Sequence, residues 1–336
     1  MALHELWERG CQFLGTEYAI LGGAMTWVSE RNLVSALSNA GAFGVIACGS
    51  MNPKLLDAEI VATAEMTDKP FGVNLITMHP ELEQLIDICI ARRIQHIILA
   101  GGLPGSSAIK QSKSGGAKVL CFAPTLGLAK RLIKQGADAI VIEGAEAGGH
   151  IGPVSTSVLA QEILPHIDEV PVFIAGGIGR GEAMVSYLEM GASGCQLGTL
   201  FVCAKESVAH EKFKKAFIRA SARDALPSVQ LDTQFSVIPV RAIQNSATKE
   251  FLTVQRDVIT AVRCGEMDHE AAQLKIEHYW AGALRRAVID GDVEGGSLMA
   301  GQSVGMVKEI KPVADIVEHL VGEALKTYSE RQRDRI

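Results

Sequence analysis

The sequence lacks the features that mark several classes of protein. Its seven cysteines include no CxxC pair and none stands at the spacing of a metal-ligand set. We therefore expect reduced thiols, no disulfide framework and no bound metal. No apolar run approaches the roughly 18 to 20 residues of a membrane-spanning helix, so we expect no membrane association. Neither a self-similar repeat nor a low-complexity tract is present.

An excess of positive charge is also missing. The 336 residues carry 32 Lys and Arg against 38 Asp and Glu, a formal net charge of −6. A chain of this charge has no field that attracts a polyanion, so nucleic acid is not expected as a partner. Its start, MALHELWER, is acidic where a secretory signal is basic and then apolar, which predicts a cytoplasmic protein. The composition, 48% hydrophobic and 21% charged, is otherwise that of a globular protein.

Short β-branched runs alternate with amphipathic stretches through the first two hundred residues. Each βα unit takes about two dozen residues, which favours a closed parallel barrel over an open sheet. Strands are expected at 18–21, 45–47, 71–75, 96–100, 118–122, 139–143, 172–175 and 195–197. Helices are expected between them, for example at 30–40, 53–65, 81–92, 126–135 and 182–190. The predicted fold class is α/β, a TIM (β/α)8 barrel.

The alternation stops after Phe201. Residues 206–221, 247–264 and 269–280 have helical charge patterns without buried-strand runs between them. We therefore expect a helical lobe at 204–280 that covers the C-terminal mouth of the barrel and the substrate. The barrel would consist of 1–203 and 281–336, and its last helix, near 312–327, would pack back on it.

Two glycine-containing turns follow the last two expected strands. They are AGGIGRG at 175–181 and QLGT at 196–199. In phosphate-binding barrels the loops after strands seven and eight supply backbone N–H groups, and glycine allows close approach to the phosphate. Glycines also simply end strands, but two such turns in this order favour a phosphate-anchored cofactor. The hydroxyl of Thr199 would add a hydrogen bond there.

His150 closes the run EGAEAGGH at 143–150, the one extended loop of the barrel. Loops at the C-terminal ends of barrel strands carry the chemistry of such folds. Imidazole titrates near neutrality, which suits His150 to proton transfer at a cofactor, whereas most single histidines are plain surface residues. Glu143, at the end of the sixth strand, either accepts hydrogen bonds from a polar ring edge or caps the loop.

Three further residues near strand ends are candidates for contact with a cofactor ring. Asn74 is polar in an otherwise apolar strand, so it bonds either a cofactor ring or loop backbone. Met25 and Trp27 follow the first strand and suit packing against a flat ring, although such residues are more often core. Neither GxxxxGK[ST] nor the GxGxxG strand–helix unit occurs, so neither a P-loop nor a dinucleotide fold is expected.

These motifs together resemble the nitronate monooxygenase (2-nitropropane dioxygenase) family and its sibling, the FMN-dependent enoyl-ACP reductases. The likeness rests on GGAMTW at 22–27, KPFGVN at 69–74, EGAEAGGH at 143–150, AGG at 175–177, QLGT at 196–199 and GGSLMAG at 295–301. It covers nearly the whole chain, and the histidine loop with the QxGT turn is its specific part. The family is a TIM barrel with FMN at the C-terminal mouth under a helical lobe.

The resemblance implies a role for each matching position. His150 would be the catalytic histidine. Cofactor contacts are implied for Met25, Asn74, Glu143, Gly148, Gly176, Gly177, Gln196, Leu197, Gly198 and Thr199. One departure is Gly22, which stands where family members commonly carry Gln. The cofactor implied is FMN, with NAD(P)H as a candidate reductant and a homodimer as a candidate assembly.

The resemblance leaves the small-molecule substrate open between two classes. A nitronate monooxygenase oxidises alkyl nitronates with O2 to a carbonyl compound and nitrite. An enoyl-ACP reductase uses NAD(P)H to reduce the double bond of an enoyl thioester, and the MTW and GGSLMAG motifs are closer to that type. Its acidic carrier protein would meet basic residues of the lobe, namely Lys212, Lys214, Lys215 and Arg219, which otherwise form a solvated helix face. A flavin-binding barrel without turnover is a third class, against which His150 argues.

Overall fold

The centre of the molecule is a barrel of eight parallel strands. The computed structural model describes residues 3–232 and 238–333, and the strands follow one another around the barrel in chain order. They are β1 (Ile20–Gly22), β2 (Gly44–Ala47), β3 (Phe71–Ile76), β4 (His96–Ala100), β5 (Lys118–Phe122), β6 (Ala139–Glu143), β8 (Val172–Ala175) and β9 (Gly194–Leu197). The predicted TIM barrel and its eight strands are confirmed, with ends within two residues of those expected.

Closure of the barrel depends on a short contact between β1 and β2. The Gly22 N–H donates to the Phe43 carbonyl at 2.9 Å, and the Phe43 N–H donates to the Ile20 carbonyl at 2.8 Å. β1 also pairs with β9, so no strand of the barrel keeps a free edge. Nearly every barrel-strand residue is buried, as expected of parallel strands with helices outside and packed side chains inside.

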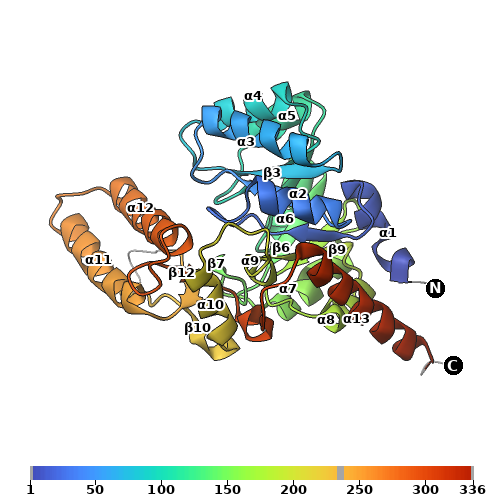
Figure 1. Cartoon of the computed structure of the whole chain (residues 1–336). Coiled ribbons are helices and arrows are strands. Elements are labelled where there is room, and N and C mark those ends of the chain that lie inside the picture. Colours follow the sequence, from blue (N-terminus) through green and yellow to red (C-terminus); the bar gives the residue numbers. More distant parts are fainter. Residues whose placement is uncertain (1–2, 233–237, 334–336) are drawn as a thin grey trace.

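Helices surround the barrel (Figure 1), and both ends of the described chain lie on the side away from the lobe. The barrel helices are α1 (Leu3–Leu14), α2 (Arg31–Asn39), α3 (Pro53–Met66), α4 (Leu82–Ala91), α5 (Ser106–Ser114), α6 (Leu126–Gln135), α7 (Thr156–Ile163), α8 (Gly181–Glu189), α9 (Thr199–Val202) and α13 (Val313–Arg333). Three short 3₁₀ turns complete them: η1 (Leu164–His166), η2 (Ala222–Asp224) and η3 (Gln302–Met306). The predicted return of the last helix is confirmed, because α13 packs against α8 and α2.

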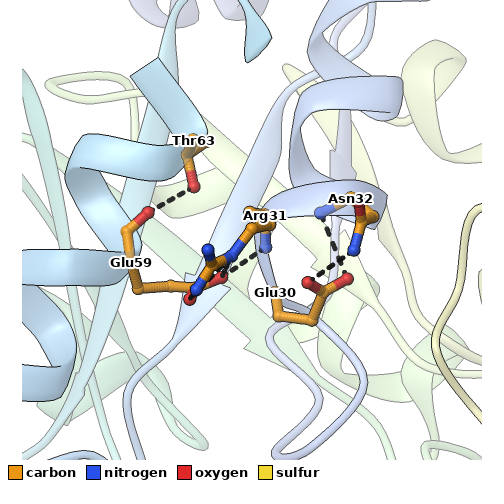
Figure 2. A network of polar contacts seen from close by, with 5 residues as sticks. All are labelled: Glu30, Arg31, Asn32, Glu59 and Thr63. Carbon is orange, nitrogen blue, oxygen red and sulfur yellow. Dashed lines mark hydrogen bonds and ion pairs between the residues drawn. The ribbon is translucent and has the colours of Figure 1, made fainter. Parts of the chain in front are cut away.

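An ion pair fixes the start of α2, directly after the loop that follows β1. Glu59 on α3 accepts hydrogen bonds from the backbone N–H of Arg31 at 2.6 Å and from its guanidinium (Figure 2). Glu30 caps the same helix by accepting from the Asn32 N–H at 3.1 Å. A carboxylate is favourable at a helix N-terminus, so the two glutamates anchor the helix and the loop before it.

The described part of the lobe contains three helices, of which the last two share a core of their own. They are α10 (Glu211–Arg219), α11 (Ser246–Arg263) and α12 (His269–Val288), of which α11 and α12 form a hairpin beside the barrel (Figure 1). Phe251, Trp280 and Ile276 belong to a hydrophobic cluster separate from that of the barrel. The expected end of the lobe at residue 280 falls inside α12, and residues 233–237 lie outside the described part.

The helical lobe also contains short strands that were not predicted from the sequence. A small antiparallel sheet joins the lobe to the barrel and is built from β10 (Ala225–Pro227), β11 (Val240–Ile243), β12 (Leu298–Met299) and β7 (Gly149–His150). Each strand has only two to four residues and pairs with a distant segment, so no strand periodicity marks it in the sequence.

The described residues contain neither a membrane-spanning helix nor a metal-binding cluster. Within 3–232 and 238–333, no helix combines the length and apolarity needed to cross a membrane. The same part of the chain contains no group of three or more His, Cys, Asp or Glu side chains arranged to hold a metal ion.

Candidate active site

Three polar side chains lie in the C-terminal halves of barrel strands, one in each of three strands. Asn74 lies in β3, Glu143 ends β6 and Gln196 lies in β9. Glu143 is in register with Ala175 of β8, and Ala175 is in register with Gln196. Paired residues of neighbouring strands project from the same face of a sheet. Glu143 and Gln196 therefore share one face, with the small side chain of Ala175 between them.

These three side chains have no hydrogen-bond partner among the described residues. No hydrogen bond is made there by the side-chain amides of Asn74 and Gln196 or by the carboxylate of Glu143. Asn74 is only 6% exposed, whereas Glu143 and Gln196 are half-buried. A buried amide is normally paired, so an unpaired Asn74, with an unpaired carboxylate and a second unpaired amide on other strands of the barrel, indicates a polar ligand with both donors and acceptors.

Glu143 has a strongly shifted acidity. Burial raises the pKa of its carboxyl to about 7, and the positive charge of nearby His150 partly opposes that rise. A group near half-ionisation at neutral pH is able to donate or accept a proton at a ligand. The alternative in which Glu143 merely caps its loop is wrong, since no loop N–H bonds to its carboxylate in the described part.

His150 lies on the mouth loop as expected, and the loop is held more firmly than its glycines suggest. The imidazole is exposed, and the backbone of His150 pairs with Val240 of the lobe strand β11. The carbonyl of Glu146 accepts from the Gln302 N–H at 2.9 Å, and its carboxylate accepts from the Thr156 N–H and hydroxyl, each at 2.9 Å. The histidine is thus presented to solvent from a fixed backbone.

The glycines of the two expected phosphate loops have distinct roles. Gly176 and Gly177 follow β8 with φ of 96° and 73°, values that L-residues rarely adopt. A Cβ on Gly177 would lie 3.0 Å from the Cβ of Glu146, so this backbone is tightly enclosed on one side. Gly181, at the other end of the same loop, instead packs against α13, where its N–H donates to Glu323 at 2.9 Å.

The remaining expected positions make close backbone contacts. A Cβ on Gly148 would lie 2.5 Å from the Gly301 nitrogen, so this glycine allows the GGSLMAG segment to cross the histidine loop. The Thr199 hydroxyl accepts from the Gly301 N–H at 3.0 Å and retains its own proton for another acceptor. Leu197 is buried, and Gly198 precedes α9.

Met25 and Trp27 lie on the loop after β1, at the same mouth. A Cβ on Gly198 would lie 3.4 Å from the Met25 sulfur, which therefore borders the QLGT turn. Trp27 has φ of 68°, an outlier for a bulky residue, and its buried indole N–H has no partner among the described residues. The Arg285 guanidinium of α12 lies 5.8 Å from the centre of the Trp27 ring. The loop thus links the barrel rim to the lobe.

Sequence reasoning missed two residues of the site, Glu146 and Arg241. Glu146 bonds Thr156, and Arg241 is a buried cation on β11 that bonds the histidine loop. The available signal for Arg241 was a charged residue inside the otherwise apolar run VRAI at 240–243. Lys214, expected on a basic face, is buried and donates to the carbonyls of Ala204 and Ser207, so it does not belong to that face.

Comparisons with known proteins extend over almost the whole chain. The family model described as nitronate monooxygenase matches residues 8–88 and 80–323. A Rhodococcus jostii protein named 5-hydroxy-7a-methyl-1-oxo-octahydro-1H-indene-4-carboxyl-CoA dehydrogenase is 27% identical over 94% of this chain and 95% of its own. A probable nitronate monooxygenase of Staphylococcus saprophyticus is 26% identical over 93% of this chain and 96% of its own.

Solved structures share the same architecture. FabK from Thermotoga maritima superposes with a TM-score of 0.87 and 34% identity, over 98% of this chain and 99% of that one. Nitroalkane oxidase from Streptomyces ansochromogenes superposes with a TM-score of 0.79 over 96% of this chain and 99% of its own. At 24% identity the second match bears on the fold alone.

Proposed function

The chain belongs to the nitronate monooxygenase family of oxidoreductases, and we propose that it is an FMN-dependent enzyme that oxidises alkyl nitronates with O2 to a carbonyl compound and nitrite. The observation that carries the proposal is the set of unpaired polar groups at the barrel mouth, Asn74, Glu143 and Gln196. Family membership implies a flavin, and its ring edge offers the donors and acceptors that these three side chains lack.

The phosphate end of FMN has a fitting set of backbone groups. Gly176 and Gly177, with Gly198 and the free hydroxyl proton of Thr199, would hold it at the ends of β8 and β9. Met25 borders the same turn and would pack beside the ring. A mononucleotide suits this rim because the chain has no GxGxxG unit for a second nucleotide.

The protein residues contribute positioning, charge and proton transfer. Bound FMN supplies the redox chemistry. A nitrogen of the exposed His150 imidazole removes the α-proton of a neutral nitroalkane, which delivers the nitronate for oxidation. Glu143, next to His150 and with a pKa of about 7, orients the ligand edge and balances the imidazolium that forms. The lobe, reaching the mouth through β11 and β12, covers the substrate.

A second candidate function is reduction of an enoyl thioester with NAD(P)H. It is favoured by the match to FabK, at 34% identity over almost the full chain, and by a relative named as a dehydrogenase of a carboxyl-CoA compound. The basic face that would meet an acidic carrier consists of Lys212, Lys215 and Arg219 without the buried Lys214. Lys215 already forms an ion pair with Glu211 at 2.7 Å, which reduces the net positive charge of this face.

Anaerobic mixing separates the two functions. The yellow protein is mixed with ethyl nitronate in one experiment and with NADH or NADPH in another, and the flavin absorbance is followed. Nitronate oxidation requires rapid bleaching by the nitronate and slow bleaching by the nicotinamides. Rapid bleaching by NADH or NADPH, with colour restored by crotonyl-CoA and no response to nitronate, would establish the reductase instead. A colourless protein that takes up no FMN would refute both.

A further inference from the structure

Arg241 is a buried cation at the junction of the lobe and the barrel. It lies on β11, is 6% exposed, and its guanidinium donates only to backbone carbonyls. Nε donates to Ala145 at 2.8 Å and Nη1 donates to Ala225 at 2.5 Å. Among the described residues it forms no ion pair, although Glu146 is near enough to stabilise its charge. Burying an arginine without a paired carboxylate is costly, so its position needs an explanation.

The two ends of the histidine loop are both bonded to this residue. The Arg241 side chain holds the carbonyl of Ala145, which lies two residues after Glu143. Its backbone pairs with Gly149, and the preceding Val240 pairs with His150. Outside the ladder, the Ile151 N–H donates to Pro239 at 2.9 Å. One residue of the lobe therefore fixes the backbone at the start and at the end of the segment that carries His150.

The geometry needs arginine in particular. A guanidinium has donors in a rigid plane and reaches two carbonyls in different directions at once, here one in the barrel loop and one in β10. A lysine at the same place keeps the positive charge, but its single flexible ammonium lacks the planar arrangement of donors. Methionine keeps the apolar stem and removes both bonds.

We propose that Arg241 is a positioning residue that holds His150 in its reactive place by clamping the loop of residues 145–150 to the lobe. The inference rests on the proposed role of His150 as the group that takes the α-proton. It makes the lobe part of the catalytic apparatus, because a strand of the lobe determines where the imidazole stands. A displacement near 1 Å in a catalytic group is able to cost about 100-fold in rate.

The test uses the FMN-loaded protein and the variants R241M, R241K, H150A and the double variant H150A/R241M. The matched control is R9M, since Arg9 on α1 also donates to a backbone carbonyl, that of Asp168 at 2.7 Å, but before the start of β8, at the end of the barrel opposite the mouth. R241M should lower kcat for nitroethane about 10- to 100-fold with little change in KM, and R241K should recover part of the loss. In the H150A background R241M should have less than a twofold effect, because the group it positions is gone.

A second readout is independent of turnover. With 13C-labelled histidine the apo-protein gives signals from its nine histidines, and the signal lost in H150A is that of His150. This signal should shift or broaden in R241M and stay in place in R9M. Equal fold losses from R241M in both backgrounds, or an unmoved His150 signal, would overturn the clamp. Full nitroethane turnover by H150A would instead overturn the proposed role of His150, while the signal would still report whether Arg241 holds it. Where R241M does not fold, R241K carries the same comparison.

Discussion

Glu143 and Gln196 stand on the same face of the barrel sheet, each in register with Ala175 between them. The two are two strand spacings apart, about 10 Å. A carboxyl with a pKa of about 7 and an unpaired amide thus lie on either side of Ala175 at the barrel mouth. The first prediction tests whether a ligand pairs with the amides of this mouth.

The first prediction concerns FMN retention. Gln196→Leu and Asn74→Leu remove amides that have no partner within the described protein, so they should cost little folding stability. Each should weaken FMN binding about 10-fold, because a polar group of the bound cofactor then loses its hydrogen bond. Titration of FMN fluorescence with the apo-protein measures this.

The matched control for that titration is Gln161→Leu. Gln161 donates to the Ser157 carbonyl at 2.9 Å on the exposed side of α7, away from the mouth. Its replacement should leave FMN affinity unchanged. Unchanged affinity in all three variants would mean that the mouth amides do not face the cofactor.

The second prediction concerns Glu143 in the apo-protein. Burial raises its pKa from 4.5 to about 7, so the folded state binds more protons than the unfolded state between these pH values. Its contribution to stability is therefore fully present below pH 4.5 and lost as pH rises toward 7. The free energy of unfolding of Glu143→Gln, relative to that of wild type, should therefore rise across this range by up to about 3 kcal/mol. Urea unfolding of both proteins at pH 5 and pH 8 measures this change. An equal difference in stability between variant and wild type at the two pH values would contradict the prediction.

The third prediction concerns His96, at the start of β4. Its Nε2 lies 2.8 Å from the Phe13 carbonyl, and its ring meets the edges of Phe13 and Phe43. Burial lowers its pKa from 6.5 to about 4, with the Phe13 carbonyl opposing. The unfolded state binds the proton first, so stability should fall as pH drops below 6.5, by up to about 3 kcal/mol near pH 4.

Replacing that histidine separates its effect from that of Glu143, which has the opposite sign. His96→Gln keeps a donor for the Phe13 carbonyl and cannot take the proton, so its loss of stability on acidification should be smaller than that of wild type. The exposed His166 serves as control in His166→Gln, which should follow wild type. Identical acid profiles for wild type and His96→Gln would show that His96 is already charged in the folded protein.

The barrel could be predicted from sequence because its strands are local, apolar and regularly spaced. The run 139–143, for example, is buried at its first four residues and half-buried at Glu143. The lobe sheet could not be predicted in this way. β11 has four residues with a charged one among them, and its partners β7 and β12 have two residues each and lie far away in the sequence. Its pairing depends on tertiary contacts alone.

The same limit applies to the site. His150 and the glycines after β8 could be chosen from residue type and loop position. The clamp by Arg241 could not, because a guanidinium bonded to two backbone carbonyls has no partner residue type in the sequence to indicate it. The left-handed backbone conformation of Trp27 was also not predicted, since bulky residues rarely adopt positive φ and no glycine stands at that position.

The last prediction separates proton transfer by His150 from ligand binding by the same residue. A neutral nitroalkane must lose its α-proton before oxidation, whereas a nitronate has already lost it. His150→Ala should therefore lower turnover of nitroethane about 10²- to 10⁴-fold, the usual contribution of a positioned acid–base group, and affect ethyl nitronate much less. Steady-state rates on both substrates, with FMN content measured in each sample, test this, and His4→Ala on the exposed side of α1 should match wild type on both. An equal loss on the two substrates would mean that His150 binds or orients the nitro group, and full activity on both with FMN bound would refute its catalytic role.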